Sequence, residues 1–85
     1  MDNMDFTMKF GGAQQEKMTV EEAMKIVYGA LKEKGYNPVN QIIGYLLSGD
    51  SSYITSYKDA RGIIRRFERD EILEEVITKY LEESR

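Results

Sequence analysis

The stretch GYNPVNQIIGYLLSGD, residues 35–50, decides the fold because it contains a helix together with the signals for both of its ends. Asn37 can cap the helix, and Pro38 fits its first turn, where no backbone N–H is needed. Apolar residues then follow at the i, i+3, i+4, i+7 and i+8 spacing of one helical face: Val39, Ile42, Ile43, Leu46 and Leu47. Gly49 marks the end. The stretch therefore predicts a helix over residues 38–48.

Gly44 lies in the middle of this predicted helix, where a glycine costs roughly 1 kcal/mol relative to alanine. Close approach of another helix at Gly44 would recover that cost. Alternatively, the glycine is simply tolerated on an exposed face. The sequence leaves both interpretations open.

One further helix is predicted before this stretch. Thr19 and Glu22 have the spacing at which a hydroxyl and a carboxylate cap each other's backbone donors. The apolar stripe that follows consists of Val20, Ala23, Val27, Ala30 and Leu31, with Met24 beside it. Gly35 can supply the left-handed turn that stops the helix. We therefore expect a helix over about residues 20–34.

Two more helices are predicted after a loop at residues 50–57. The third helix runs from about Thr55 or Lys58 to Phe67, and its buried side consists of Ala60, Ile63, Ile64 and Phe67. Asp70 can cap a fourth helix. Because no proline or glycine forces a break at Arg69–Asp70, one continuous helix is also possible.

The first 18 residues show no sustained period, and we interpret them as a flexible tail in front of a helical domain at residues 19–85. Within the tail, Phe6, Met8 and Phe10 alternate with Thr7 and Lys9, which is also the pattern of a short strand. Thr7 is the candidate phosphorylation site of the tail. A phosphate there would add about −1.5 to −2 charges and could dock the tail on a basic surface or recruit a partner.

Composition excludes several classes of chemistry. At 85 residues the chain has room for one domain, too small to enclose a typical substrate cavity. It has no cysteine and no histidine, so disulfides, the common metal sites and imidazole- or thiol-dependent nucleophiles are excluded. We expect no catalytic residue, no metal and no cofactor. Since neither a membrane-spanning run nor a signal peptide is seen, we expect no membrane insertion and a cytoplasmic location.

The helices predict an all-α fold, a compact bundle of four to five short helices. Their wide apolar faces leave more apolar surface than one small bundle easily covers, which favours a homodimer. The final helix is the candidate interface, through Ile72, Leu73, Val76, Ile77, Tyr80 and Leu81. The alternative is that this face packs entirely within the monomer.

Basic residues spaced by three or four form a predicted ridge on the third helix: Lys58, Arg61, Arg65 and Arg69, with Arg66 beside it. Residues 70–85 carry six acidic and two basic side chains and could neutralise the ridge within or across subunits. Alternatively, the ridge docks a phosphorylated or acidic segment of a partner protein. Nucleic acid is a third interpretation. It is disfavoured by the net charge of −3 and by the lack of Lys or Arg in residues 38–48.

Several of these sequence stretches are typical of one protein family. The stretch at residues 35–50, followed by Tyr53, Tyr57, Ala60-Arg61, Ile64-Arg65 and the run ERDEI at residues 68–72, resembles the IreB family of small bacterial regulatory phosphoproteins. The resemblance covers about residues 5–81. It implies a cytoplasmic helical homodimer with a disordered N-terminal tail.

The resemblance also implies phosphorylation of the tail by a membrane PASTA-type Ser/Thr kinase and reversal by a PP2C-type phosphatase. By the same resemblance, the protein is expected to be a negative regulator in cell-envelope stress signalling, including cephalosporin resistance. Thr7 falls at the family's phosphoacceptor, whereas Met4 stands where the family can have a second threonine. We therefore expect a non-enzymatic regulator that binds a downstream protein. The alternative is a constitutive helical scaffold or nucleic-acid-associated module that is never phosphorylated.

Overall fold

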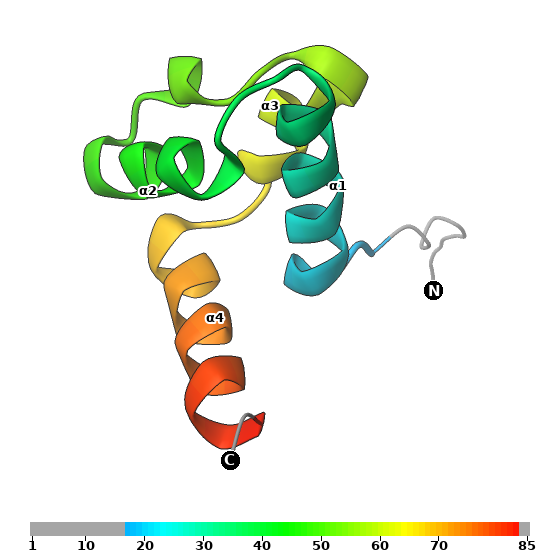
Figure 1. The fold of residues 1–85 in the computed structure, drawn as a ribbon. Helices are drawn as coiled ribbons and strands as arrows, with labels where there is room; N and C mark the ends of the chain where they lie inside the picture. The colour runs from blue at the N-terminus through cyan, green and yellow to red at the C-terminus, as the bar shows by residue number, and fades with distance from the viewer. Residues whose placement is uncertain (1–16, 84–85) are drawn as a thin grey trace, which may run out of the picture.

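A computed structural model describes residues 17–83, which form four α-helices and two short 3-10 turns (Figure 1). In chain order the elements are α1 (Val20–Glu33), α2 (Pro38–Ser48), η2 (Ser51–Tyr53), η3 (Tyr57–Asp59), α3 (Ala60–Ile64) and α4 (Arg69–Glu83). No strand occurs between residues 17 and 83, so the predicted all-α class is confirmed for this part of the chain. The predictions of a flexible tail and of a short strand at residues 6–10 lie outside the described residues.

The first two helices begin and end where the sequence predicts. At the start of α1, the Glu22 backbone N–H donates to Thr19 Oγ1 at 3.1 Å, and the Thr19 backbone N–H donates to Glu22 Oε1 at 3.0 Å. At the start of α2, the Asn40 backbone N–H donates to Asn37 Oδ1 at 3.1 Å. Gly49 follows α2 with a φ of 78°, the left-handed conformation that glycine adopts without strain.

The predicted third helix, from Thr55 or Lys58 to Phe67, is wrong in both of its ends. Lys58 and Asp59 have φ values of 53° and 60°, so the backbone is left-handed there and α3 starts only at Ala60. After Ile64 the chain turns, and the Phe67 N–H reaches back only three residues, to the Ile64 carbonyl at 3.4 Å. The third helix is therefore a short piece of five residues.

The turn at residues 65–68 settles whether the C-terminal helix is continuous: α4 is a separate helix that begins at Arg69. The Glu68 backbone N–H donates to Glu71 Oε1 at 3.3 Å at its start. Asp70 lies in the first turn of α4 and is not its cap, contrary to the prediction. Its carboxylate still suits the positive end of the helix.

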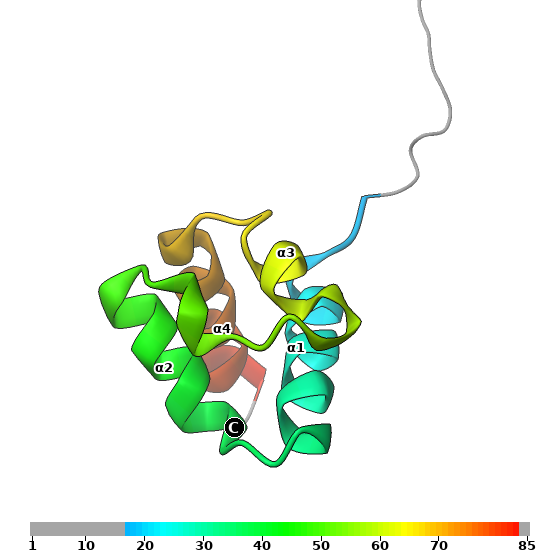
Figure 2. The same ribbon diagram turned by 90° about the horizontal axis from the view of Figure 1, so that it is seen from above.

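The core forms mainly where α1 packs against α3 and α2. Its residues are Ala23, Val27, Ala30, Leu31, Ile42, Tyr45, Ile54, Ala60, Ile63, Ile64 and Ile72. Helix α4 contributes only Ile72 to this cluster and projects away from the other helices (Figure 1). Seen from above, α4 lies behind α1 and α2, between them (Figure 2). Helix α4 therefore packs on the core less extensively than α1, α2 and α3 do.

Candidate functional site

An open apolar groove of about 690 Å³ lies between α1, α2 and α4. Its apolar lining consists of Val20, Met24 and Tyr28 from α1, Val39, Ile42, Ile43 and Leu46 from α2, and Leu73 and Val76 from α4. Four charged side chains also line it: Glu21, Lys25, Glu75 and Lys79. The groove has the size of a ligand or partner site, and its walls are apolar side chains from three helices.

The groove exists because α1 and α2 each carry more apolar residues than the core uses. On α1 the core takes Ala23, Val27, Ala30 and Leu31, which leaves Val20, Met24 and Tyr28 at a spacing of four residues along the groove. On α2 the core takes Ile42 and Tyr45. Val39 and Ile43 remain 57% and 47% exposed. The feature of the sequence that indicated such a surface was the breadth of the apolar faces on these two helices.

The predicted interface residues of α4 divide into two groups. Ile72 is 1% exposed and belongs to the core of its own chain, so it is not available to a partner as predicted. The other five remain exposed by 39% to 71%: Leu73, Val76, Ile77, Tyr80 and Leu81. Their predicted place in a dimer interface is not tested by a single chain. A helix that exposes this much apolar surface is typical of an interaction site.

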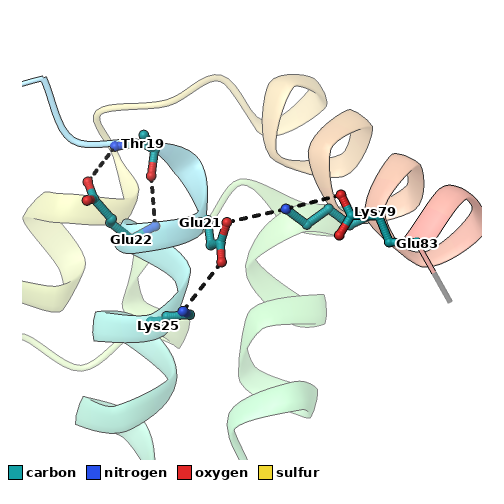
Figure 3. Close-up of polar contacts among 6 residues, drawn as sticks. All are labelled: Thr19, Glu21, Glu22, Lys25, Lys79 and Glu83. Atoms are coloured by element: carbon teal, nitrogen blue, oxygen red, sulfur yellow. Dashed lines mark hydrogen bonds and ion pairs between the residues drawn. The ribbon is translucent and has the colours of Figure 1, made fainter.

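An ion pair between Glu21 and Lys79 joins α1 to α4 at the groove, with 3.3 Å between Lys79 Nζ and Glu21 Oε1 (Figure 3). Lys25 Nζ lies 3.4 Å from the other oxygen of Glu21, and Lys79 Nζ lies 3.5 Å from Glu83 Oε2. The hydrogen bond from Lys79, followed by that from Lys25, lowers the pKa of Glu21. The same contact with Glu21 raises the pKa of Lys79. The pair is a direct polar contact between α1 and α4.

The predicted basic residues do not form one ridge on one helix. They are distributed over η3, α3, the turn after it and the start of α4. Arg61 Nε donates to the Ile54 carbonyl at 2.8 Å, and Arg69 Nη1 donates to the Leu46 carbonyl at 3.1 Å. Both guanidinium groups therefore hold backbone carbonyls of their own chain. The prediction of one basic ridge, made from the helical spacing, is wrong because the chain leaves helical geometry at residues 58–59 and again at 65–68.

Lys58 is also engaged, through a polar cluster that the sequence did not reveal. Its Nζ lies 3.1 Å from Glu33 Oε2, and the Tyr57 hydroxyl donates to Glu33 Oε1 at 2.8 Å. The hydrogen bond from Tyr57, followed by that from Lys58, lowers the pKa of Glu33. No spacing rule could have found this cluster, since Glu33 and Tyr57 are 24 residues apart in the chain.

Arg65 and Arg66 are the remaining members of the predicted ridge. Both are exposed in the turn between α3 and α4. Within residues 17–83 neither has a hydrogen-bond or ion-pair partner. The predicted neutralisation by the acidic C-terminal segment therefore does not occur within the described part of the monomer. These two arginines are the cations of the predicted set that can take an external anion.

No group of three or more His, Cys, Asp or Glu side chains in the described part of the chain could hold a metal ion. No helix in residues 17–83 has both the length and the apolar composition needed to span a bilayer. The proposed phosphorylation site, Thr7, lies outside the described residues.

The described residues thus define a small helical protein whose prominent features are an uncovered apolar groove and two unpaired arginines, as in a protein-interaction module. The family model for the IreB regulatory phosphoprotein matches residues 5–82. A UPF0297 protein of Clostridioides difficile (strain 630) is 68% identical over 79 residues, which cover 93% of each chain. The chain belongs to the IreB family, as the resemblance indicated.

Proposed function

We propose that this protein is a non-enzymatic, cytoplasmic regulatory phosphoprotein whose folded part is a dimeric platform and whose input is phosphorylation of Thr7. The observation that carries this proposal is the match to a family of regulatory phosphoproteins over residues 5–82, a range that includes Thr7. The kinase is a membrane PASTA-type Ser/Thr kinase, and a PP2C-type phosphatase removes the phosphate. The protein acts as a negative regulator in cell-envelope stress signalling and cephalosporin resistance.

Thr7 is the acceptor because residues 1–16 contain no other hydroxyl side chain. The next threonine, Thr19, accepts a hydrogen bond from the Glu22 backbone N–H in the capping box of α1. Phosphorylation of Thr19 would place the phosphate beside the carboxylates of Glu21 and Glu22, where like charges repel. A single site at Thr7 is therefore the simplest expectation.

A second copy of the chain covers the groove in this proposal. The groove and the exposed residues of α4 are both apolar, and Leu73 and Val76 belong to both. In a two-fold dimer both copies contribute the same surfaces to the interface. The α4 face of each copy therefore lies on the groove of the other. This removes Val76, Ile77 and Tyr80 from water, which a monomer leaves 43%, 51% and 71% exposed.

The downstream protein binds the basic residues at the other end of α4. Of the five residues predicted for this role, Arg65 and Arg66 have no hydrogen-bond or ion-pair partner among residues 17–83, whereas Arg61 and Arg69 bind backbone carbonyls. Guanidinium groups bind carboxylate and phosphate oxygens in a two-pronged geometry. The partner surface is therefore acidic.

The proposed function is tested in cells that lack the native protein and carry a variant. Thr7→Val removes the acceptor hydroxyl with little change in size, and Thr7→Ser keeps it. We expect the cephalosporin resistance of the Thr7→Val strain to differ from wild type while the Thr7→Ser strain matches it. A constitutive scaffold predicts that the strains with wild-type, Thr7→Val and Thr7→Ser protein are equally resistant, and that result would reject the proposal.

A further inference from the structure

Arg65 and Arg66 are exposed cations just before α4, and Glu82 and Glu83 are exposed carboxylates at its other end. In the described part of the chain the two arginines and Glu82 have no ion-pair partner, and Glu83 pairs with Lys79 of its own helix at 3.5 Å. The two groups cannot meet within one chain, because the 15 residues of α4 hold them about 22 Å apart. Each end of the helix therefore offers charges that a neighbouring chain can complement.

We propose that α4 of one copy pairs antiparallel with α4 of a second copy, so that Glu82 and Glu83 of each copy bind Arg65 and Arg66 of the other. The pairing rests on the proposed function, because it requires the dimer proposed there. It specifies the direction and the register of the two helices. The acidic end of the second copy and an acidic downstream protein use the same guanidinium groups and therefore compete for them.

The apolar residues of α4 permit an antiparallel pair. Leu73 and Tyr80 lie seven residues apart with Val76 and Ile77 between them, as in the seam of a two-stranded coiled coil. All four side chains are 39% or more exposed in one chain. A two-fold axis that passes between Val76 and Ile77 places Leu73 of each copy opposite Tyr80 of the other. The pair thus removes the same apolar surface of both copies from water.

The same register brings opposite charges together. At 1.5 Å per residue along the helix, Arg69 lies about 11 Å from the two-fold axis on one side, and Glu83 lies about 10 Å from it on the other. Glu83 of the second copy is therefore level with Arg69 to within about 2 Å, next to the turn that carries Arg65 and Arg66. Packed helices are about 8–10 Å apart, a distance that long charged side chains beside an apolar seam can span.

The charges favour the antiparallel direction over the parallel one. Residues 65–69 contain three arginines and one glutamate, whereas residues 80–83 contain two glutamates and no cation. A parallel pair would place each end beside its own copy, where like charges repel, whereas an antiparallel pair places the two kinds of end together. Asp70 and Glu71 follow the arginines, but they lie in the first turn of α4, where the positive end of the helix stabilises carboxylates.

Charge reversal tests the contact on the full-length protein, with the dimer Kd measured by sedimentation velocity over a range of concentrations. Arg65→Glu/Arg66→Glu and Glu82→Lys/Glu83→Lys should each raise the Kd about tenfold, because each dimer then contains two repulsive contacts. Lys32→Glu/Lys34→Glu changes the net charge as much as the arginine variant does, at the end of α1, and should stay within about threefold of wild type. Circular dichroism checks that each variant is folded.

A mixture of the two weakened variants distinguishes a contact between copies from a contact within one chain. In a mixed pair the reversed charges of each chain complement those of the other. Native mass spectrometry, which separates the two chains by mass, should therefore show the heterodimer well above its share from random pairing, with a Kd within about threefold of wild type. A contact within one chain would leave the repulsion in every chain, so that mixing would restore nothing.

Three results overturn the inference and leave the proposed dimer intact: equal Kd values for wild type and both reversal variants, random pairing in the mixture, or an equal loss in the lysine control. A wild-type chain that is only monomeric at micromolar concentration refutes the proposed dimer together with the contact. Phosphorylation plays no part in these measurements, so a failure of the contact is distinguishable from a failure of the kinase input at Thr7.

Discussion

The ring of Tyr53 lies against the backbone of Gly44, so closely that a Cβ built on Gly44 would be 2.5 Å from Tyr53 Cε1. The Gln41 side-chain amide donates to the Tyr53 carbonyl at 2.9 Å beside this contact. Of the two interpretations that the sequence left open for Gly44, close approach is the one found. The approaching group is a tyrosine ring from η2 and not another helix. The glycine thereby lets the loop pack on the middle of α2.

Two helix glycines should respond oppositely to alanine. Gly44→Ala should destabilise the protein by about 1 kcal/mol, because the ring of Tyr53 must move to make room for the added Cβ. The free-energy cost of that movement should exceed the gain in helix propensity. Gly29→Ala, in α1, should stabilise it by up to about 1 kcal/mol, because no atom lies within 4 Å of the added Cβ. Urea unfolding followed by circular dichroism measures both. In a Tyr53→Ala background Gly44→Ala should become stabilising, and the same sign in both backgrounds would refute the ring contact as the cause.

Arg69 should act as a structural residue and Arg65 should not. Removing the Arg69 guanidinium with Arg69→Ala leaves the Leu46 carbonyl without its donor and should cost about 1 kcal/mol of unfolding free energy. Arg65→Ala removes an exposed side chain with no partner among the described residues and should change stability by less than about 0.5 kcal/mol. Thermal and urea unfolding compare the two. Equal losses would contradict the division of the basic residues into positioning and binding groups.

A charge on the apolar face of α4 should prevent dimerisation. Val76 lines the groove and is 43% exposed, so glutamate there can stay solvated in a monomer but would be buried in the proposed dimer. Sedimentation velocity at micromolar concentration should show a dimer for wild type and a monomer for Val76→Glu. Thr78→Glu adds the same charge at an exposed polar position of α4 and should remain dimeric. A wild-type chain that sediments only as a monomer would disprove the proposed dimer.

The cluster around Glu33 should contribute stability that depends on pH. The contacts of Tyr57 and Lys58 lower the pKa of Glu33 from its usual value of 4.5, so the charged form is favoured in the folded state. A group with a depressed folded pKa stabilises the fold above its unfolded pKa, and that contribution is lost as the pH falls through the folded pKa. Wild type should therefore exceed Glu33→Gln in stability at pH 7, and the difference should shrink below about pH 4.5. A difference in melting temperature that is constant from pH 7 to pH 3 would contradict this assignment.

The raised pKa of Lys58 sets the upper end of the pH range in which the Glu33 cluster contributes to stability. Its hydrogen bond to Glu33 raises the pKa from 10.5, so the contribution of Lys58 is fully present below that value and is lost as the pH rises through the folded pKa. Both side chains are exposed, so the effect should also decrease with added salt.

The sequence predicted the helices whose ends carry local signals. The capping box at Thr19 and Glu22, and the pair Asn37 and Pro38, determine hydrogen bonds within a few residues, so their outcome does not depend on the rest of the fold. Residues 55–68 were predicted poorly because no local signal favours the left-handed backbone at Lys58 and Asp59. Such a conformation occurs mostly at glycine, and the contacts that accompany it here come from Glu33, far away in the chain.

The candidate site was predictable in composition but not in geometry. The broad apolar faces indicated surface beyond the needs of one core, and the structure locates that surface in the groove beside α4. The periodicity could not show which residues serve the core, which is why Ile72 was assigned to the interface. Similarly, the spacing of the basic residues implied a single helix face, because the breaks at residues 58–59 and 65–68 carry no sequence signal of their own.

The most direct test of the account is to incubate the purified protein with a cognate PASTA-type kinase and ATP, then to measure intact mass and map the modified residue. The account predicts one phosphate per chain, located on Thr7, with none on Thr19 and none in the Thr7→Val variant. A subsequent incubation with a PP2C-type phosphatase should restore the original mass. A chain that remains unmodified at Thr7, or that is modified equally well in the Thr7→Val variant, would contradict the central claim.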